Sequence, residues 1–111
     1  MCSIASFIAG GGGAAYTASK HALAGFTRQL ALDYAKDKIQ VFGIAPGAVK
    51  TAMTASDFEP GGLADWVAQE TPIGRWSNPE EIADLTEFLA SGKASSMQGE
   101  IIKIDGGWSL K

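Results

Sequence analysis

The sequence predicts an α/β fold in which short, buried parallel strands alternate with helices. Two mostly apolar runs, Ile39–Ala45 and Glu100–Asp105, are each stopped by turn residues, Pro46-Gly47 and Gly106-Gly107. A helical pattern precedes each run, and the order helix, strand, helix, strand is typical of a parallel sheet. Because a parallel pair needs cover on both faces and neighbours at its edges, the two strands predict only part of a sheet.

The first helix is predicted from Ala14 to near Lys36. It follows Ser3, at the end of a possible strand, the apolar segment Ile4–Ile8 and the glycine run Gly10–Gly13, where regular structure breaks. The residues that recur three and four positions apart are Tyr16, Lys20, Leu23, Phe26 or Thr27, Leu30 and Tyr34. A second face of this helix consists mostly of small residues: Ala18, Ala22, Gly25 and Gln29. Small side chains allow another helix to approach closely.

The second long helix has the clearest start signal in the chain. After an irregular stretch over residues 51–71, with a short amphipathic piece at Leu63–Gln69, Asn78 is a good N-cap and Pro79 occupies the first helical position. Asn78 and Glu81 have the spacing of a capping box. The apolar stripe that follows, before Ser91-Gly92, comprises Ile82, Leu85, Phe88 and Leu89.

Composition narrows the class of protein. The chain has 111 residues, a net charge of −3 and 46% hydrophobic residues, which fits a globular protein and gives no electrostatic footprint for nucleic acid. Cys2 and His21 are the only residues of their types, so we expect no internal disulfide and no metal site rich in thiolate or imidazole. No apolar run approaches the ~20 residues that span a bilayer, and the first residues lack a signal peptide's basic region. We expect a cytoplasmic protein.

Tyr16 and Lys20 are the residues best suited to chemistry. Their spacing of four places a phenol and an ammonium on the same helix face. A cation within ~4–6 Å favours the phenolate and would lower the tyrosine pKa from about 10 by ~1–3 units, towards the range of a general acid or base. A hydroxyl such as that of Ser3, brought close by the intervening loop, would hold a carbonyl oxygen beside the phenol. The competing interpretation is a chance surface pair.

Four further signals occur in order around this pair. Ser3 lies 13 residues before Tyr16, and Pro46-Gly47-Ala48-Val49-Lys50-Thr51 follows the first predicted strand. Pro72-Ile73-Gly74-Arg75 precedes the capped helix, and Gly99 and Asp105-Gly106-Gly107 flank the last strand. Together with Tyr-x-x-x-Lys, these motifs resemble the short-chain dehydrogenase/reductase family, most closely its 3-oxoacyl-(acyl-carrier-protein) reductase-like members.

The resemblance implies a fold and an extent. Residues 1–111 would form the C-terminal catalytic portion of a single domain with a Rossmann-like, doubly wound parallel sheet. The elements would be the end of the family's strand 5, its catalytic helix, strand 6, a lid segment, a helix and strand 7. The chain contains no Thr-Gly-x-x-x-Gly-x-Gly turn and no Asn-Asn-Ala-Gly segment, so the N-terminal dinucleotide-binding part of the family is absent from it.

The resemblance also implies roles at matching positions. Tyr16 would be the general acid or base of hydride transfer between NADP or NAD and a carbonyl or secondary alcohol. Lys20 would lower the Tyr16 pKa and bind the nicotinamide ribose, and Ser3 would orient the carbonyl. Pro46, Gly47, Val49 and Thr51 would line the nicotinamide end of the cofactor. Whether NADP or NAD is preferred is not readable from these residues.

Two functional hypotheses follow from the resemblance. In the first, the chain is the C-terminal part of an NAD(P)H-dependent reductase of a small carbonyl or acyl substrate, without a nucleic-acid or membrane partner. It would work as a homo-oligomer, a dimer or tetramer, or with a separately supplied N-terminal part. In the second, the chain is a truncated, catalytically inert fragment that acts at most as an association module.

Several other residues have alternative interpretations. Gly10–Gly13 is expected to be a flexible loop over a substrate pocket rather than a phosphate-binding loop, because no complete strand precedes it. Trp66 and Trp76 fit either a substrate pocket or a place in the core or at an interface. Arg75 is expected to be structural, with an acidic carrier as the alternative ligand. Cys2 is expected to be a small buried residue. His21 is expected to point away from Lys20 and to be structural or at a subunit contact.

Overall fold

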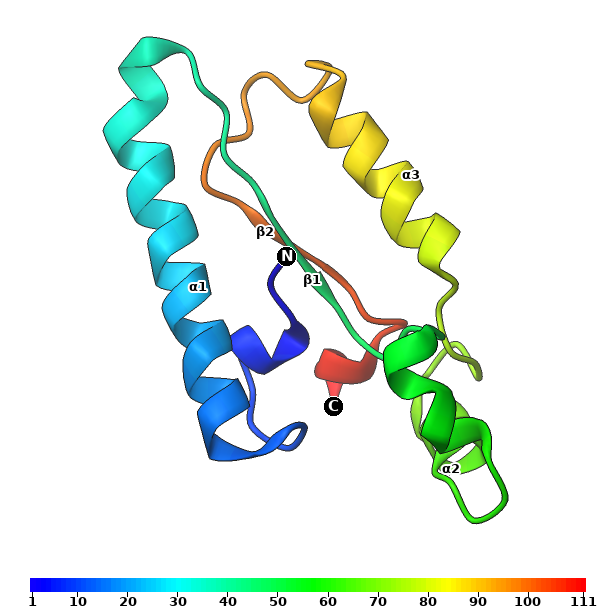
Figure 1. The fold of residues 1–111 in the computed structure, drawn as a ribbon. Helices are drawn as coiled ribbons and strands as arrows, with labels where there is room; N and C mark the ends of the chain where they lie inside the picture. The colour runs from blue at the N-terminus through cyan, green and yellow to red at the C-terminus, as the bar shows by residue number, and fades with distance from the viewer.

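The chain folds around a two-stranded parallel sheet with a helix on either side (Figure 1). The computed structural model describes all 111 residues. Strand β1 is Gly43–Pro46 and β2 is Ile101–Ile104, paired in register from Gly43 opposite Ile101 to Pro46 opposite Ile104. The predicted α/β class with parallel strands is therefore confirmed.

The strands are shorter than the apolar runs that predicted them. Before β1, the amide of Val41 donates to the side-chain oxygen of Gln98 (3.0 Å), and the Val41 carbonyl accepts from Gly99 (3.0 Å). A side chain thus replaces the backbone of a partner strand at this point, and the regular ladder begins only at Gly43.

Helix α1 spans Gly13–Tyr34 and continues as a 3-10 turn, Ala35–Asp37. It ends at Lys38, whose φ of 60° is left-handed. Its buried stripe consists of small residues, Ala24, Thr27 and Ala31, whereas Phe26 is 58% exposed. The small stripe allows a close approach to the rest of the chain: a Cβ on Gly99 would lie 3.1 Å from the Ala31 Cβ.

Helix α3, Pro79–Ala90, begins where the sequence predicts. The Asn78 amide donates to Glu81 Oε2 at 2.7 Å, which is the glutamate half of a capping box. Ile82 and Leu89 face the sheet and form the main apolar cluster with Ile44 and Ala94. This cluster fixes α3 against one face of β1.

The start of the chain differs from the prediction. Residues 1–3 form no strand, and Ile4–Ser6 is a 3-10 turn. Ser3 caps this turn, because its hydroxyl accepts from the Ala5 amide at 3.1 Å. A strand forms only against a partner, and β1 pairs with β2 alone in this chain.

The segment between β1 and α3 contains a 3-10 stretch, Ala52–Phe58, and the short helix α2, Ala64–Glu70. The predicted amphipathic piece at Leu63–Gln69 corresponds to α2. A last 3-10 turn, Trp108–Leu110, follows β2. None of the helices is long and apolar enough to cross a bilayer.

Candidate functional site

The Tyr16–Lys20 pair lies at the start of α1, and the structure places the two side chains together. Lys20 Nζ lies 5.4 Å from the centroid of the Tyr16 ring, and Tyr16 is 41% exposed. The ammonium is therefore on the same helix face as the phenol, as the spacing predicts. Gly12 sits directly beside this ring: with a φ of 84°, it would place a Cβ 2.5 Å from Tyr16 Cδ1. A side chain there would displace Tyr16.

Hydrogen bonds tie the segment that carries Ser3 to the Lys20 turn. Ser6 Oγ donates to the Lys20 carbonyl at 2.8 Å and accepts from the Ser3 amide at 3.4 Å. Lys20 Nζ donates to the Met1 carbonyl at 3.1 Å. Ser6 is only 5% exposed. Ser3, Tyr16 and Lys20 thus belong to one connected cluster, with Ser6 as a member that the sequence reasoning missed.

The Pro46-Gly47 turn forms a second cluster at the end of β1. The Gly47 amide donates to the Ile104 carbonyl at 3.1 Å. A Cβ on Gly47 would lie 2.9 Å from both Cα and Cβ of Asp105. Only glycine permits this approach without movement of the neighbouring backbone, so the turn after β1 and the turn after β2 lie against each other.

Val49 and Thr51 continue from this turn. The amide of Ser77 donates to Ala48 at 2.9 Å, and Lys50 donates back to the Ser77 carbonyl at 3.0 Å. The Val49 carbonyl accepts from Thr54 Oγ1 at 2.9 Å, whereas the Val49 amide donates to no atom of the chain. Thr51 is exposed at the start of the next 3-10 stretch. This segment therefore holds two polar groups in fixed positions: the Val49 amide, which has no partner, and the exposed Thr51 side chain.

Asp105 organises the turn next to Gly47. Partial burial raises its pKa, but hydrogen bonds from Ser109 and Gly107 and the charge of Lys103 outweigh burial and hold the pKa below its usual value. The Gly107 amide donates to Oδ1 at 3.0 Å and the Ser109 amide to Oδ2 at 2.9 Å. The ionised carboxylate therefore fixes the chain after β2.

The two clusters lie at the same end of the molecule. Figure 1 shows the start of α1 and the carboxyl ends of β1 and β2 at this end. No hydrogen bond of the chain joins the Tyr16 cluster directly to the Pro46–Thr51 segment. In open parallel sheets, ligands bind outside the carboxyl ends of the strands.

The other residues for which the sequence suggested alternative roles make contacts within the chain. Arg75 makes a two-point ion pair with Glu81, at 2.8 and 3.0 Å. Trp76 packs on Phe58 at 4.9 Å between centroids and donates to the Ala64 carbonyl, which ties the Ala52–Phe58 stretch to α2. Trp66 is 53% exposed, and its ring meets that of Trp108 edge-on. Cys2 is buried, as expected. His21 Nδ1 lies 3.0 Å from the Thr17 carbonyl of the same helix.

Comparisons with known proteins cover almost the whole chain. A family model described as enoyl-(acyl carrier protein) reductase matches residues 1–109. Gluconate 5-dehydrogenase of Gluconobacter oxydans (strain 621H) is 36% identical over 107 residues, which are 96% of this chain and 42% of that protein.

Solved structures agree with this match. A short chain dehydrogenase family protein from Francisella tularensis subsp. tularensis SCHU S4 superposes with a TM-score of 0.89 at 37% identity, over 99% of this chain and 49% of that one. A gluconate 5-dehydrogenase from Burkholderia cenocepacia J2315, in complex with NADP and tartrate, gives a TM-score of 0.90 at 32% identity, over 99% of this chain and 43% of that one. The chain spans less than half the length of each of these relatives.

Proposed function

The chain belongs to the short-chain dehydrogenase/reductase family, and on that basis we propose that it supplies the catalytic, nicotinamide-end portion of an NAD(P)-dependent oxidoreductase. The reaction is hydride transfer between the nicotinamide and the carbon of a small-molecule carbonyl or secondary alcohol. The observation that carries the proposal is the Tyr16–Lys20 contact at the carboxyl end of a parallel sheet.

In this proposal Tyr16 moves the proton. As hydride reaches the carbonyl carbon, the Tyr16 hydroxyl protonates the oxygen, and in the reverse direction the phenolate accepts the proton. Lys20, whose Nζ lies 5.4 Å from the centroid of the Tyr16 ring, binds the nicotinamide ribose. Ser3 orients the carbonyl by donating a hydrogen bond from its hydroxyl to the oxygen. Oriented donors of this kind stabilise the developing alkoxide.

The segment from Pro46 to Thr51 would hold the nicotinamide end of NADP or NAD. Gly47 permits the tight turn, and the Val49 amide has no partner within the chain and is free for a ligand acceptor. Pro46 stiffens the turn and has no amide that would need an acceptor. Thr51 adds an exposed hydroxyl beside it. The cofactor, when bound, supplies the hydride.

The test removes the phenolic hydroxyl in an assembled enzyme. The N-terminal part of a relative is joined upstream of Met1, and ketone-dependent oxidation of NADPH or NADH is followed. Tyr16→Phe should lower turnover by at least about 10²-fold, the low end of what a general acid contributes, while cofactor binding stays nearly unchanged. Tyr34→Phe is the matched control, because Tyr34 is 45% exposed on the same helix. Retained turnover in Tyr16→Phe would reject Tyr16 as the acid.

A further inference from the structure

We propose that Gly12 is a positioning residue for the proton transfer at Tyr16, because the absence of a side chain at this position lets the Tyr16 ring lie back along α1 beside Lys20. The inference deepens the proposed function and rests on it, since Tyr16 is the acid there. Gly12 acts through Tyr16 and needs no contact with substrate or cofactor. Its effect is on where the phenol is held and not on how the cofactor is bound.

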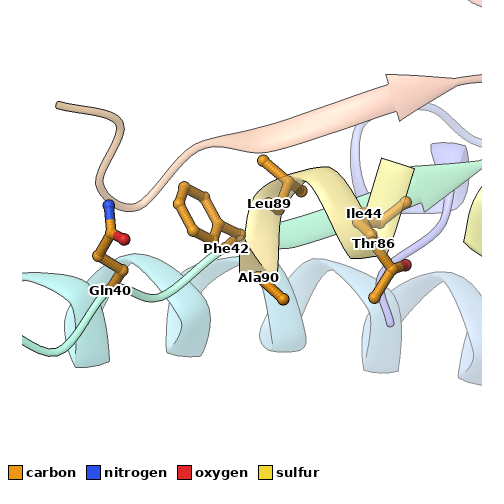
Figure 2. Close-up of a pocket in the computed structure, with 6 residues that line it drawn as sticks. All are labelled: Gln40, Phe42, Ile44, Thr86, Leu89 and Ala90. Atoms are coloured by element: carbon orange, nitrogen blue, oxygen red, sulfur yellow. The ribbon is translucent and has the colours of Figure 1, made fainter. Parts of the chain in front are cut away.

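The hollow between α3 and β1 offers no alternative place for this proton transfer. It measures about 380 Å³. Its two polar side chains are already occupied: Gln40 donates to the Ala94 carbonyl at 3.0 Å, and Thr86 donates to the Ile82 carbonyl at 2.7 Å. Figure 2 shows the six lining residues, none of which is titratable: Gln40, Phe42, Ile44, Thr86, Leu89 and Ala90. This hollow therefore supplies no proton donor, and the residues that orient Tyr16 decide where the proton is delivered.

The direction of a helical side chain brings the Tyr16 ring over Gly12. Side chains of an α-helix lean towards its N-terminus, over the residue about one turn earlier. Gly12 holds that place for Tyr16, as Tyr16 does for Lys20. A Cβ on Gly12 would lie 2.5 Å from Cδ1 of Tyr16, 2.8 Å from Cγ and 3.1 Å from Cβ. Because Cγ and Cβ are among these atoms, rotation of the ring about its own axis does not clear the contact, and the whole side chain has to move.

Little else in the chain fixes the ring. Tyr16 is 41% exposed, and the one side chain hydrogen-bonded to it, Ser19, donates to its backbone carbonyl at 2.7 Å. The Tyr16 hydroxyl has no partner within the chain, and Lys20 Nζ lies 5.4 Å from the ring centroid. The orientation of the phenol therefore depends on packing, and the bare Cα of Gly12 is part of the surface on which the ring packs.

Gly12 differs in this respect from the other glycines of its run. A Cβ on Gly10, Gly11 or Gly13 would meet no atom within 4 Å. Gly13 nevertheless has nearly the same φ as Gly12, 78° against 84°. Backbone strain would therefore penalise a side chain about equally at both positions, whereas only a side chain at position 12 would meet Tyr16. Gly13 is thus a matched control for Gly12.

The place of Gly12 at the start of α1 also argues for a role beyond the backbone. It is the N-cap residue of the helix and makes no side-chain cap. Asn, Asp and Ser are preferred at this position, and Asn also accepts a positive φ. A capping side chain here would have to pass through the space of the Tyr16 ring. Glycine therefore keeps room for the ring at the expense of a cap.

The test compares Gly12→Ala with Gly13→Ala in the same joined enzyme as Tyr16→Phe. Carbon atoms in contact are about 3.5–4.0 Å apart, so the new methyl group at position 12 displaces Tyr16 by about 1 Å or more. Gly12→Ala should lower kcat by about tenfold or more, because a misplacement of about 1 Å can cost ~10²-fold in rate. The KM for the cofactor should stay nearly unchanged, and Gly13→Ala should keep the kcat of the unmodified enzyme.

A double variant distinguishes positioning from a merely structural role. Tyr16→Phe keeps the ring but has no hydroxyl, so displacement of its ring costs no proton transfer. Gly12→Ala added to Tyr16→Phe should therefore leave the residual turnover unchanged, whereas a structural defect would lower it further. A further loss would overturn the positioning role, and so would an unchanged kcat in Gly12→Ala alone.

A measurement on the 111-residue chain does not depend on turnover. Nuclear Overhauser contacts should join the Gly12 α protons to the Tyr16 ring in the unmodified chain and in Gly13→Ala. Gly12→Ala should lose the contact between residue 12 and the ring in its present geometry. Circular dichroism establishes that each variant is folded. If Gly12→Ala unfolds, Gly12→Asn and Gly13→Asn replace the pair, because Asn accepts a positive φ more readily than Ala.

The outcomes separate this inference from the proposed function. Absence of the Gly12–Tyr16 contact in the unmodified chain would overturn the inference. Loss of turnover in Tyr16→Phe without a loss in Gly12→Ala would reject the positioning role alone. Retained turnover in Tyr16→Phe would instead reject the proposed function.

Discussion

At the scale of single residues, glycine decides how closely the parts of the candidate site approach. We expect Gly47→Ala to destabilise the chain by about 1–3 kcal/mol, the usual cost of overpacking, because the new Cβ would lie 2.9 Å from the Asp105 backbone. The free energy of unfolding in urea measures this. Gly25→Ala is the control, since its Cβ meets open space within α1 and should stabilise the helix. Equal stabilities of the two variants would contradict the close approach.

Residues whose roles are local were predictable from the sequence, and residues that act across the fold were not. The Tyr16–Lys20 contact follows from a spacing of four on one helix. Ser6 acts on Lys20, 14 residues away, and its only sequence signal is a serine three positions after Ser3, the spacing of a cap. Gly12 stands inside a glycine run, where nothing distinguishes the one position that touches the Tyr16 ring.

At the scale of elements, the start of α3 predicts a pH dependence. The Arg75 hydrogen bond and the Asn78 amide lower the pKa of Glu81 to about 2. A lowered pKa means that the Glu81 contribution to stability is present above the unfolded value of 4.5 and is lost as the pH falls from there through about 2. The thermal midpoint of Glu81→Gln should therefore depend less on pH across this interval than that of the unmodified chain.

Glu80→Gln is the matched control for this experiment, because Glu80 is the exposed neighbour of Glu81 and has no ion pair. It should keep the pH dependence of the unmodified chain between pH 4.5 and 2. If the curve of Glu81→Gln coincides with that of Glu80→Gln, the ion pair with Arg75 does not anchor the start of α3.

The helix whose start is marked by capping residues was predicted well. The strands were not, because their extent depends on the neighbouring strand. The cap at Asn78 and Pro79 located α3 to the residue. Both strands came out shorter than their apolar runs, because a strand ends where its ladder ends. The predicted strand end at Ser3 caps a 3-10 turn instead, and it pairs with no strand in this chain.

At the scale of the whole molecule, the composition is that of a globular protein, but the chain is less compact than a domain of its length. The radius of gyration is 15.2 Å, whereas a compact domain of this length has about 13 Å. Apolar side chains such as Phe26, Leu32 and Trp66 are more than half exposed. Composition counts apolar residues without saying what covers them, so the exposure of these side chains follows from the fold and not from the composition.

A motif that these residues do not contain leads to a prediction for the 111-residue chain alone. The nicotinamide end of the proposed cofactor site is present at Gly47 and Val49, but the sequence has no glycine-rich turn to hold the pyrophosphate at a helix start. The isolated 111 residues should therefore show no saturable NADPH binding in the micromolar range, measured by cofactor fluorescence. The same chain joined to the N-terminal part of a relative should bind. Saturable micromolar binding by the isolated chain would mean that its own residues grip the dinucleotide, and would contradict the division of labour between the two parts.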